Sequence, residues 1–221
     1  GALIHYLRDT QKSHLGHITA LIPFPTHSYM ALDQCTLTSL ELVQSSEGTR
    51  KNSLLDLLDL SLTPMGARRI REWILKPLIK LETIQERLSI VDSFKKNPTG
   101  RKELRGLLKN IFDLERLLGR ITLAACNARD LVALKTSLKV FPEILEALKA
   151  YESIPLQIYL EDWDNIENIC ELIDQNIVDE PPLGLKEGNL IKPGCNEELD
   201  RLKKITRQGK KWIAALEQEE K

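Results

Sequence analysis

The most distinctive pattern of hydrophobic and polar positions lies at residues 53–78, SLLDLLDLSLTPMGARRIREWILKPL. Thr63-Pro64 predicts the start of a helix, because a threonine hydroxyl can accept a hydrogen bond from a free backbone N–H and proline tolerates the first helical position. The helix is predicted to end before Pro77, since the residue before a proline avoids helical angles. Its apolar side is marked by residues at helical spacing: Met65, Ile70, Trp73 and Ile74.

Apolar residues recur every three or four positions along most of the remaining chain, which predicts further helices. The longest run opens at the capping residue Asn127, and Pro142 within it predicts a bend in one helix rather than two separate helices. Asp164 and Glu167 form a capping-box pair that predicts a helix start. Other helices are predicted at residues 2–10, 81–97, 101–110 and 113–121, the last with Leu114, Leu117, Leu118 and Ile121 inward.

A final long helix is predicted from Asn196, whose side chain can cap it, to Lys221. Acidic residues follow the cap, where the helix dipole favours negative charge. At 1.5 Å per residue the helix would extend ~38 Å, far enough to project from a compact body. Its buried side is predicted to comprise Leu199, Leu202, Ile205, Gly209, Trp212 and Leu216.

Few segments carry a β pattern. Residues 28–33 and 39–43 predict two short strands or extended segments around a turn, and residues 183–193 predict a small hairpin or ordered loop. Residues 11–29, with Pro23 and Pro25, are typical of a linker. The predicted fold class is therefore mainly α, an irregular multi-helix bundle with one or two short β-strand pairs and a long projecting C-terminal helix.

Composition narrows the class of protein. The chain has 221 residues, 42% of them hydrophobic and 29% charged, which is typical of a globular protein with a real core. The net charge of −1 gives no general attraction to nucleic acid or anionic membrane. No apolar run reaches the ~18 residues that a membrane helix needs. The four cysteines form no C-x-x-C pair and predict reduced thiols in a cytoplasmic protein.

Most candidate chemical sites have a simpler structural reading. His14 and His17 lack the further ligands that a metal needs, so a solvated linker is favoured. The helix face with Glu167, Glu171 and Asp174 is predicted to be solvated rather than to bind a cation or a basic partner. Structural ion pairs are favoured over a phosphate site for the arginines Arg68, Arg69 and Arg71. No phosphate-binding loop or nucleophile motif is present, and we name no catalytic, cofactor-binding or metal-binding residue.

Several blocks of the sequence resemble the MutS family of DNA mismatch-repair ATPases, specifically its helical core or lever domain. The main block is LTPMGARRIREWILKPL at residues 62–78. Further blocks occur in family order and cover nearly the whole chain: MALD at 30–33, LEL at 40–42, DLER at 113–116, VDEPP at 178–182 and NEELD at 196–200.

The resemblance implies an organisation and a function. Residues 1–28 would be the tail of a connector domain with its linker, and residues 29–221 the core domain, cut within a lever helix. The chain lacks an initiator Met and its helical pattern continues to Lys221, which predicts an excised segment. The full-length family members bind mismatched duplex DNA, use ATP and Mg²⁺ and act as dimers. No cofactor or membrane contact is expected for this segment, whose partners would be other domains of the same chain.

Within this picture the roles of individual residues are structural. The segment would couple mismatch-binding and clamp regions to an ATPase domain as a rigid scaffold. The expected keystones of this scaffold are Thr63, Pro64, Met65, Gly66, Trp73 and Asn196. Weak DNA contact is a secondary expectation for the basic side chains of the last helix, Lys203, Arg207 and Lys210.

One competing hypothesis belongs to a different class of protein. The chain could be a self-standing helical adaptor that binds a partner protein through an exposed groove. That hypothesis predicts a capped C-terminus, whereas the sequence shows no glycine or proline after the last helical residues. A phosphate-binding loop encoded downstream would favour the scaffold, and an early stop codon would favour the adaptor.

Overall fold

The computed structural model describes residues 2–11, 28–151, 156 and 166–219. In this described part the chain is mainly helical, and β pairing is limited to isolated bridges, which confirms the predicted multi-helix class. The α-helices are α1 (Ala2–Gln11), α2 (Gln34–Ser39), α3 (Leu54–Leu58), α4 (Pro64–Leu75), α5 (Leu81–Lys96), α6 (Pro98–Leu108), α7 (Leu114–Thr122), α8 (Ala128–Lys149), α10 (Glu167–Asn176) and α11 (Glu197–Glu219), and η2 (Leu185–Glu187) is a 3-10 helix.

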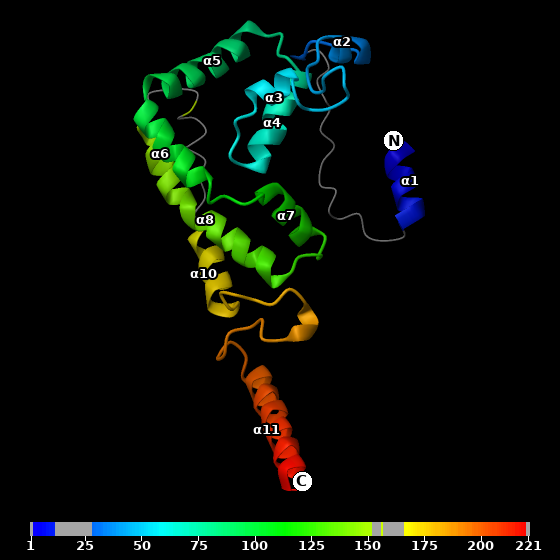
Figure 1. The fold of residues 1–221 in the computed structure, drawn as a ribbon, viewed down its shortest axis with the longest axis vertical. Helices are drawn as coiled ribbons and strands as arrows, with labels where there is room; N and C mark the ends of the chain where they lie inside the picture. Colours follow the sequence, from blue (N-terminus) through cyan, green and yellow to red (C-terminus); the bar gives the residue numbers. More distant parts are fainter. Residues whose placement is uncertain (1, 12–27, 152–155, 157–165, 220–221) are drawn as a thin grey trace.

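The central helix α8 organises the body (Figure 1), and it packs against α6, α7 and α10. Its N-terminal half contributes Ala128 and Leu134 to one buried cluster, which also contains Ile173 of α10. Its C-terminal half contributes Ile144 to a second cluster with Leu104 of α6. Two small cores along one helix therefore replace a single large core, and the body is elongated.

Helix starts follow the predicted capping chemistry. Asn127 Oδ1 accepts a hydrogen bond from the N–H of Asp130 at 2.9 Å, and Asp130 Oδ2 accepts one from the N–H of Asn127 at 2.8 Å. This capping box begins α8, which passes through Pro142 as one helix, as predicted. Asp164, the other predicted cap, lies outside the described residues, and α10 begins at Glu167.

The central stretch forms the predicted helix α4. Thr63 Oγ1 accepts a hydrogen bond from the N–H of Gly66 at 3.1 Å, and Pro64 occupies the first helical position. Met65 packs against the second core cluster. Trp73 is 41% exposed, with the guanidinium carbon of Arg87 at 4.1 Å from its ring centroid. The apolar side of α4 is thus only partly buried in this chain.

The predicted strands at residues 28–33 and 39–43 are wrong as a pair. Asp33 Oδ1 accepts a hydrogen bond from the N–H of Thr36 at 2.7 Å, and this cap begins α2 where a turn was predicted. Tyr29 instead forms an isolated bridge with Leu78, next to α4. The second predicted β region, residues 183–193, is an ordered loop that contains η2 and one residue of the bridge between Ile177 and Ile191.

The final helix projects from the body as predicted, and it extends away from α10 at the lower end of the molecule (Figure 1). The prediction that Leu202 and Ile205 lie on its buried side is wrong, because each of these side chains is 55% exposed. Leu118, predicted to point inward from α7, is also more than half exposed. No described helix packs closely along α11, so Leu202 and Ile205 have little cover from the described residues.

Candidate functional site: the joint of the projecting helix

The segment of residues 177–196, which we call the joint, connects α10 to the projecting helix. Its two limbs are tied together, because the N–H of Val178 donates to the Leu190 carbonyl at 3.0 Å and the N–H of Lys192 donates to the Asn176 carbonyl at 2.8 Å. The turn at its far end uses Gly188 with φ +71°, a conformation that residues with a Cβ rarely adopt. The joint is therefore a closed, hydrogen-bonded loop.

Apolar contacts seat this loop on the body. Ile177 is buried in the same cluster as Leu134 of α8 and Ile173 of α10, and both Leu190 and Ile191 pack against that cluster. Full burial of an aliphatic side chain such as that of Ile177 contributes about 1.5–3 kcal/mol, and the partly buried Leu190 and Ile191 contribute less. The base of the joint is thus part of the core, whereas its tip extends outward.

A buried lysine holds the joint to α8 by charge. Lys135 is 7% exposed, and its Nζ lies 2.8 Å from Asp174 Oδ1 of α10 and 3.2 Å from Asp179 Oδ1 of the joint. Lys192 Nζ reaches the same two carboxylates at 4.0 and 3.7 Å, and Lys139 Nζ lies 3.7 Å from Asp174 Oδ2. Five charged groups from α8, α10 and the joint therefore form one network.

The network shifts the titration of its members. The hydrogen bond to Asp174 raises the pKa of Lys135 above its ordinary value, against the opposing effect of burial, and the bond to Asp179 adds to the rise. Conversely, the hydrogen bond from Lys135 lowers the pKa of Asp174. Both groups are charged at neutral pH, so the lysine is buried as a paired cation.

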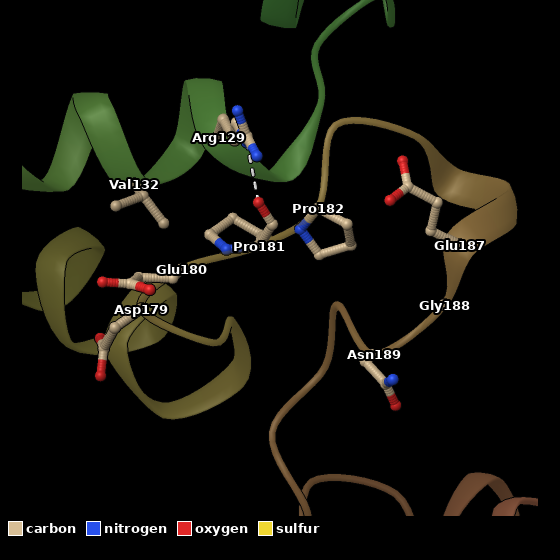
Figure 2. Close-up of a pocket in the computed structure, with 9 residues that line it drawn as sticks. All are labelled: Arg129, Val132, Asp179, Glu180, Pro181, Pro182, Glu187, Gly188 and Asn189. Atoms are coloured by element: carbon tan, nitrogen blue, oxygen red, sulfur yellow. Dashed lines mark hydrogen bonds between the residues drawn. The ribbon is translucent and has the colours of Figure 1, made fainter.

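A second cation of α8 holds the joint at Pro181 (Figure 2). Arg129 Nε donates a hydrogen bond to the Pro181 carbonyl at 2.8 Å. Pro181 is buried, and the following Pro182 has a fixed φ, so this part of the joint has little conformational freedom. Together Lys135 and Arg129, which lie less than two turns apart on α8, hold the joint at two points.

The projecting helix begins directly from this loop. Asn196 Oδ1 accepts a hydrogen bond from the N–H of Leu199 at 2.9 Å, which confirms the predicted cap. Asp200 Oδ2 accepts one from the N–H of Gly194 at 2.7 Å, and Lys203 Nζ donates to the Ile191 carbonyl at 3.1 Å. The first turns of α11 are thus bonded to the joint.

A hollow of about 650 Å³ lies between the joint and α8 (Figure 2). Asp179, Glu180 and Glu187 line it together with Arg129. Asp179 pairs with Lys135, and Glu187 Oε1 accepts a hydrogen bond from the N–H of Gly184 at 2.8 Å. These carboxylates organise the loop, and across the described residues no group of three His, Cys, Asp or Glu side chains is arranged to hold a metal ion.

The residues expected from sequence to be keystones do not form one site. Thr63, Pro64, Met65, Gly66 and Trp73 lie on α4, beside α3. Asn196 begins α11, far from α4 along the molecule (Figure 1). The two groups therefore act at separate places, one in the body and one at the joint.

The basic residues of α11 are only partly described. The ammonium group of Lys203 is bonded to the joint, so it has a structural role. The side chains of Arg207 and Lys210 lie outside the described part of the chain, and DNA contact through them stays a prediction. The candidate metal residues His14 and His17 are likewise outside it.

Two expectations about charged groups have definite outcomes. Arg68 forms the predicted structural ion pairs, with Asp113 and Glu115 at the start of α7, and Arg69 pairs with Glu72. The predicted solvated acidic face is confirmed in part: Glu167 and Glu171 are exposed and the Asp174 side chain is 46% exposed, although three lysines of the network pair with Asp174.

Sequence reasoning missed Lys135, Arg129 and Asp179 as a set. The signal that could have found Lys135 is its position beside Leu134 and Leu138, on the apolar seam of the longest helix. A lysine on a core-facing seam needs a carboxylate partner. Its partners lie 39 and 44 residues away, too far for helical spacing to identify.

Comparisons with known proteins identify the family of the chain. A family model described as MutS domain III matches residues 35–220. The chain is 42% identical to the DNA mismatch repair protein MutS of Acetivibrio thermocellus, over the whole chain and 26% of that relative. It is 45% identical to the protein of the same name from Alkaliphilus oremlandii, over the whole chain and 25% of the relative. In Methanococcoides burtonii the identity is 39%, over the whole chain and 26% of the relative.

The chain spans about a quarter of the length of these curated relatives. No described helix is both long and apolar enough to cross a membrane. The family match covers α2 to α11, including the joint and both core clusters. The chain therefore belongs to the MutS family, in which it corresponds to domain III of a DNA mismatch repair protein.

Proposed function

We propose that this domain acts as a mechanical scaffold that couples DNA-binding regions of a mismatch-repair protein to an ATPase domain. The observation that supports the proposal is the way in which α11, as far as the structure describes it, is attached to the body at one end only. This helix leaves the body through the joint, and among the described helices none packs along it. A stiff helix mounted at one end transmits rotation of its base to its far end.

The joint is suited to hold the base of that helix. Lys135 and Arg129 bind it from α8, and α8 itself packs against α6, α7 and α10. A displacement of the projecting helix would therefore act on the body through these contacts. Coupling of this kind needs two distant sites that bias the same element.

The proposal extends to the full-length protein. It would bind mismatched duplex DNA, use ATP and Mg²⁺ and act as a dimer in the cytoplasm, and this domain would contain no catalytic residue. The keystones Thr63, Pro64, Met65, Gly66 and Trp73 would stabilise the body, and Asn196 would stabilise the start of the arm. The family match favours this scaffold over a self-standing adaptor.

A helix break in α11 tests the coupling. In a longer protein that contains this chain, Gly209→Pro removes a hydrogen bond in the middle of α11 and costs about 3 kcal/mol of local helix stability. We expect mismatched DNA to lose its effect on the ATPase rate, while basal ATPase activity and DNA binding persist. Gly209→Ala is the matched control, because nothing lies within 4 Å of the added Cβ. An unchanged effect of DNA in Gly209→Pro would contradict the proposal.

A further inference from the structure

A second hollow, of about 570 Å³, lies between α7 and the N-terminal half of α8. Its apolar lining includes Leu117 of α7, Val132 and Ala133 of α8, and Leu183 of the joint. Leu183 is 65% exposed, and Phe112 at the other edge is 50% exposed. The hollow therefore offers an open apolar surface large enough for a few side chains.

The carboxylates around this hollow are already bound. Asp113 accepts two hydrogen bonds from Arg68, at 2.7 and 2.8 Å, and caps α7 through the N–H of Arg116. Asp130 accepts one from the N–H of Asn127 and pairs with Arg120 at 3.0 Å. Neither carboxylate is left to neutralise a further cation.

Three arginines line the hollow, and two of them are less fully used than Arg120, which pairs with Asp130. The guanidinium of Arg116 is exposed; its charge acts on the nearby Asp113, but within the described part of the chain it makes no hydrogen bond or ion pair. Arg129 uses Nε for the Pro181 carbonyl, and its terminal nitrogens make no bond within the described part of the chain. Because a guanidinium has five N–H donors in a planar fork, both arginines retain donors suited to a carboxylate.

We infer that this hollow binds an acidic, amphipathic segment of a partner protein. Carboxylates of the segment would bind Arg116 and Arg129, and an aliphatic side chain between them would occupy the apolar lining. A protein segment is favoured over a DNA backbone, because phosphates and sugars offer no aliphatic group for Val132 and Leu183. The inference can be tested apart from the coupling function, because Arg116 lies on α7 and makes none of the contacts that hold the joint to α8.

The probe is a short fluorescein-labelled peptide of alternating glutamate and leucine, and the measurement is fluorescence anisotropy with the 221-residue chain. We expect saturable binding, and Arg116→Glu should weaken it by at least about tenfold, the scale of a close charge pair at an interface. Leu183→Asp should weaken it similarly. A peptide with glutamine in place of glutamate should not bind.

The control variant is Arg71→Glu, which makes the same charge change at an exposed arginine of α4 away from the hollow. It should leave the affinity unchanged. Arg116→Glu removes no hydrogen bond between side chains of the described chain, so its thermal unfolding should match that of the parent.

Three results would overturn the inference. They are absence of peptide binding at millimolar protein, equal affinity of Arg116→Glu and the parent chain, and equal binding of the glutamine peptide. Duplex DNA that displaces the peptide and itself loses affinity in Arg116→Glu would assign these arginines to phosphates instead. Because none of these variants alters α11, the outcome is separate from the test of coupling.

Discussion

The ammonium nitrogen of Lys135 lies 2.8 Å from Oδ1 of Asp174, although the two residues are 39 positions apart. The lysine is buried, whereas the aspartate side chain is 46% exposed. This asymmetry makes the two residues unequal in their effect on stability. Removal of the aspartate leaves a buried cation, while removal of the lysine leaves carboxylates that water can reach.

We therefore predict different outcomes for two substitutions in this pair. Asp174→Ala should lower the free energy of unfolding by about 1–3 kcal/mol, because the Lys135 ammonium then keeps only Asp179 nearby among acidic partners. Lys135→Met should be close to neutral, since a side chain of similar volume replaces a buried charge. Urea unfolding of both variants measures the difference.

The control for this pair is Glu171→Ala, an exposed position on the same helix α10, which should change stability by less than about 0.5 kcal/mol. Equal destabilisation by Asp174→Ala and Lys135→Met would contradict the prediction, because the burial of Lys135 would then make no difference between the two substitutions.

Stability should depend on pH through two carboxylates with lowered pKa. The hydrogen bonds from Arg68 hold the pKa of Asp113 below its ordinary value, and the bond from Lys135 does the same for Asp174. A group with a lowered pKa contributes stability that is fully present above its ordinary value of 3.8 and is lost as the pH falls through the folded-state pKa.

Urea unfolding between pH 6 and pH 2 measures this loss. The decrease should be smaller in Asp113→Asn, because that variant has no carboxylate to protonate at this position. Lys135 has the opposite sign: its raised pKa contributes stability that is present below its ordinary value of 10.5 and is lost as the pH rises above that value. If acid lowered the free energy of unfolding equally in Asp113→Asn and the parent chain, the Asp113 carboxylate would not contribute to the pH dependence.

Two glycines of α6 should respond oppositely to alanine. A Cβ at Gly100 would lie 2.8 Å from Asn97 Nδ2 and 2.9 Å from the Tyr151 hydroxyl oxygen, so Gly100→Ala should destabilise the protein by about 1–3 kcal/mol. At Gly106 nothing lies within 4 Å, so Gly106→Ala should stabilise it by up to about 1 kcal/mol through helix propensity. Thermal unfolding of the two variants compares them directly, and a stabilising Gly100→Ala would contradict the close packing.

Gly66→Leu should lower the melting temperature. A Cβ at Gly66 would lie 3.1 Å from Thr63 Oγ1, the oxygen that caps α4, and 3.4 Å from the side chain of Ser61. The crowded neighbour is therefore the cap of its own helix, and not a second helix. Loss of such a cap costs about 1 kcal/mol, which lowers the melting temperature of a domain of this size by about 2–4 °C.

A double-mutant cycle tests this explanation. Thr63→Ala alone should cost about 1 kcal/mol, and Gly66→Leu should cost less in the Thr63→Ala background than in the parent chain. Additive effects would show that Gly66 acts through something other than the cap.

Local sequence rules predicted most of the helices. Thr63-Pro64, Asn127 and Asn196 begin helices as predicted, because a cap and the backbone N–H groups that it satisfies lie within three residues of each other. The same rules failed at residues 28–43, where β-favouring residues suggested strands. There the cap formed by Asp33 and the lack of a neighbouring strand favoured a short helix.

The joint could not be predicted as a site, although its parts could. The sequence indicated an ordered loop, a solvated acidic face and a long seam on α8. Only the packing of α10 and the loop on α8 brings Asp174 and Asp179 to Lys135. Periodicity reports which residues share a helix face, but it does not report which other element covers that face.

The sequence by itself determined the helical class, the caps at Thr63, Asn127 and Asn196, the single long helix through Pro142 and the family, because each depends on residues close together in the chain or on matching blocks. The tertiary structure decided that Lys135 is a buried paired cation, that Leu202 and Ile205 of α11 are exposed, and that Lys203 is bonded to the joint. The physical reason is that burial and charge pairing depend on neighbours from distant segments, which only the folded chain brings together.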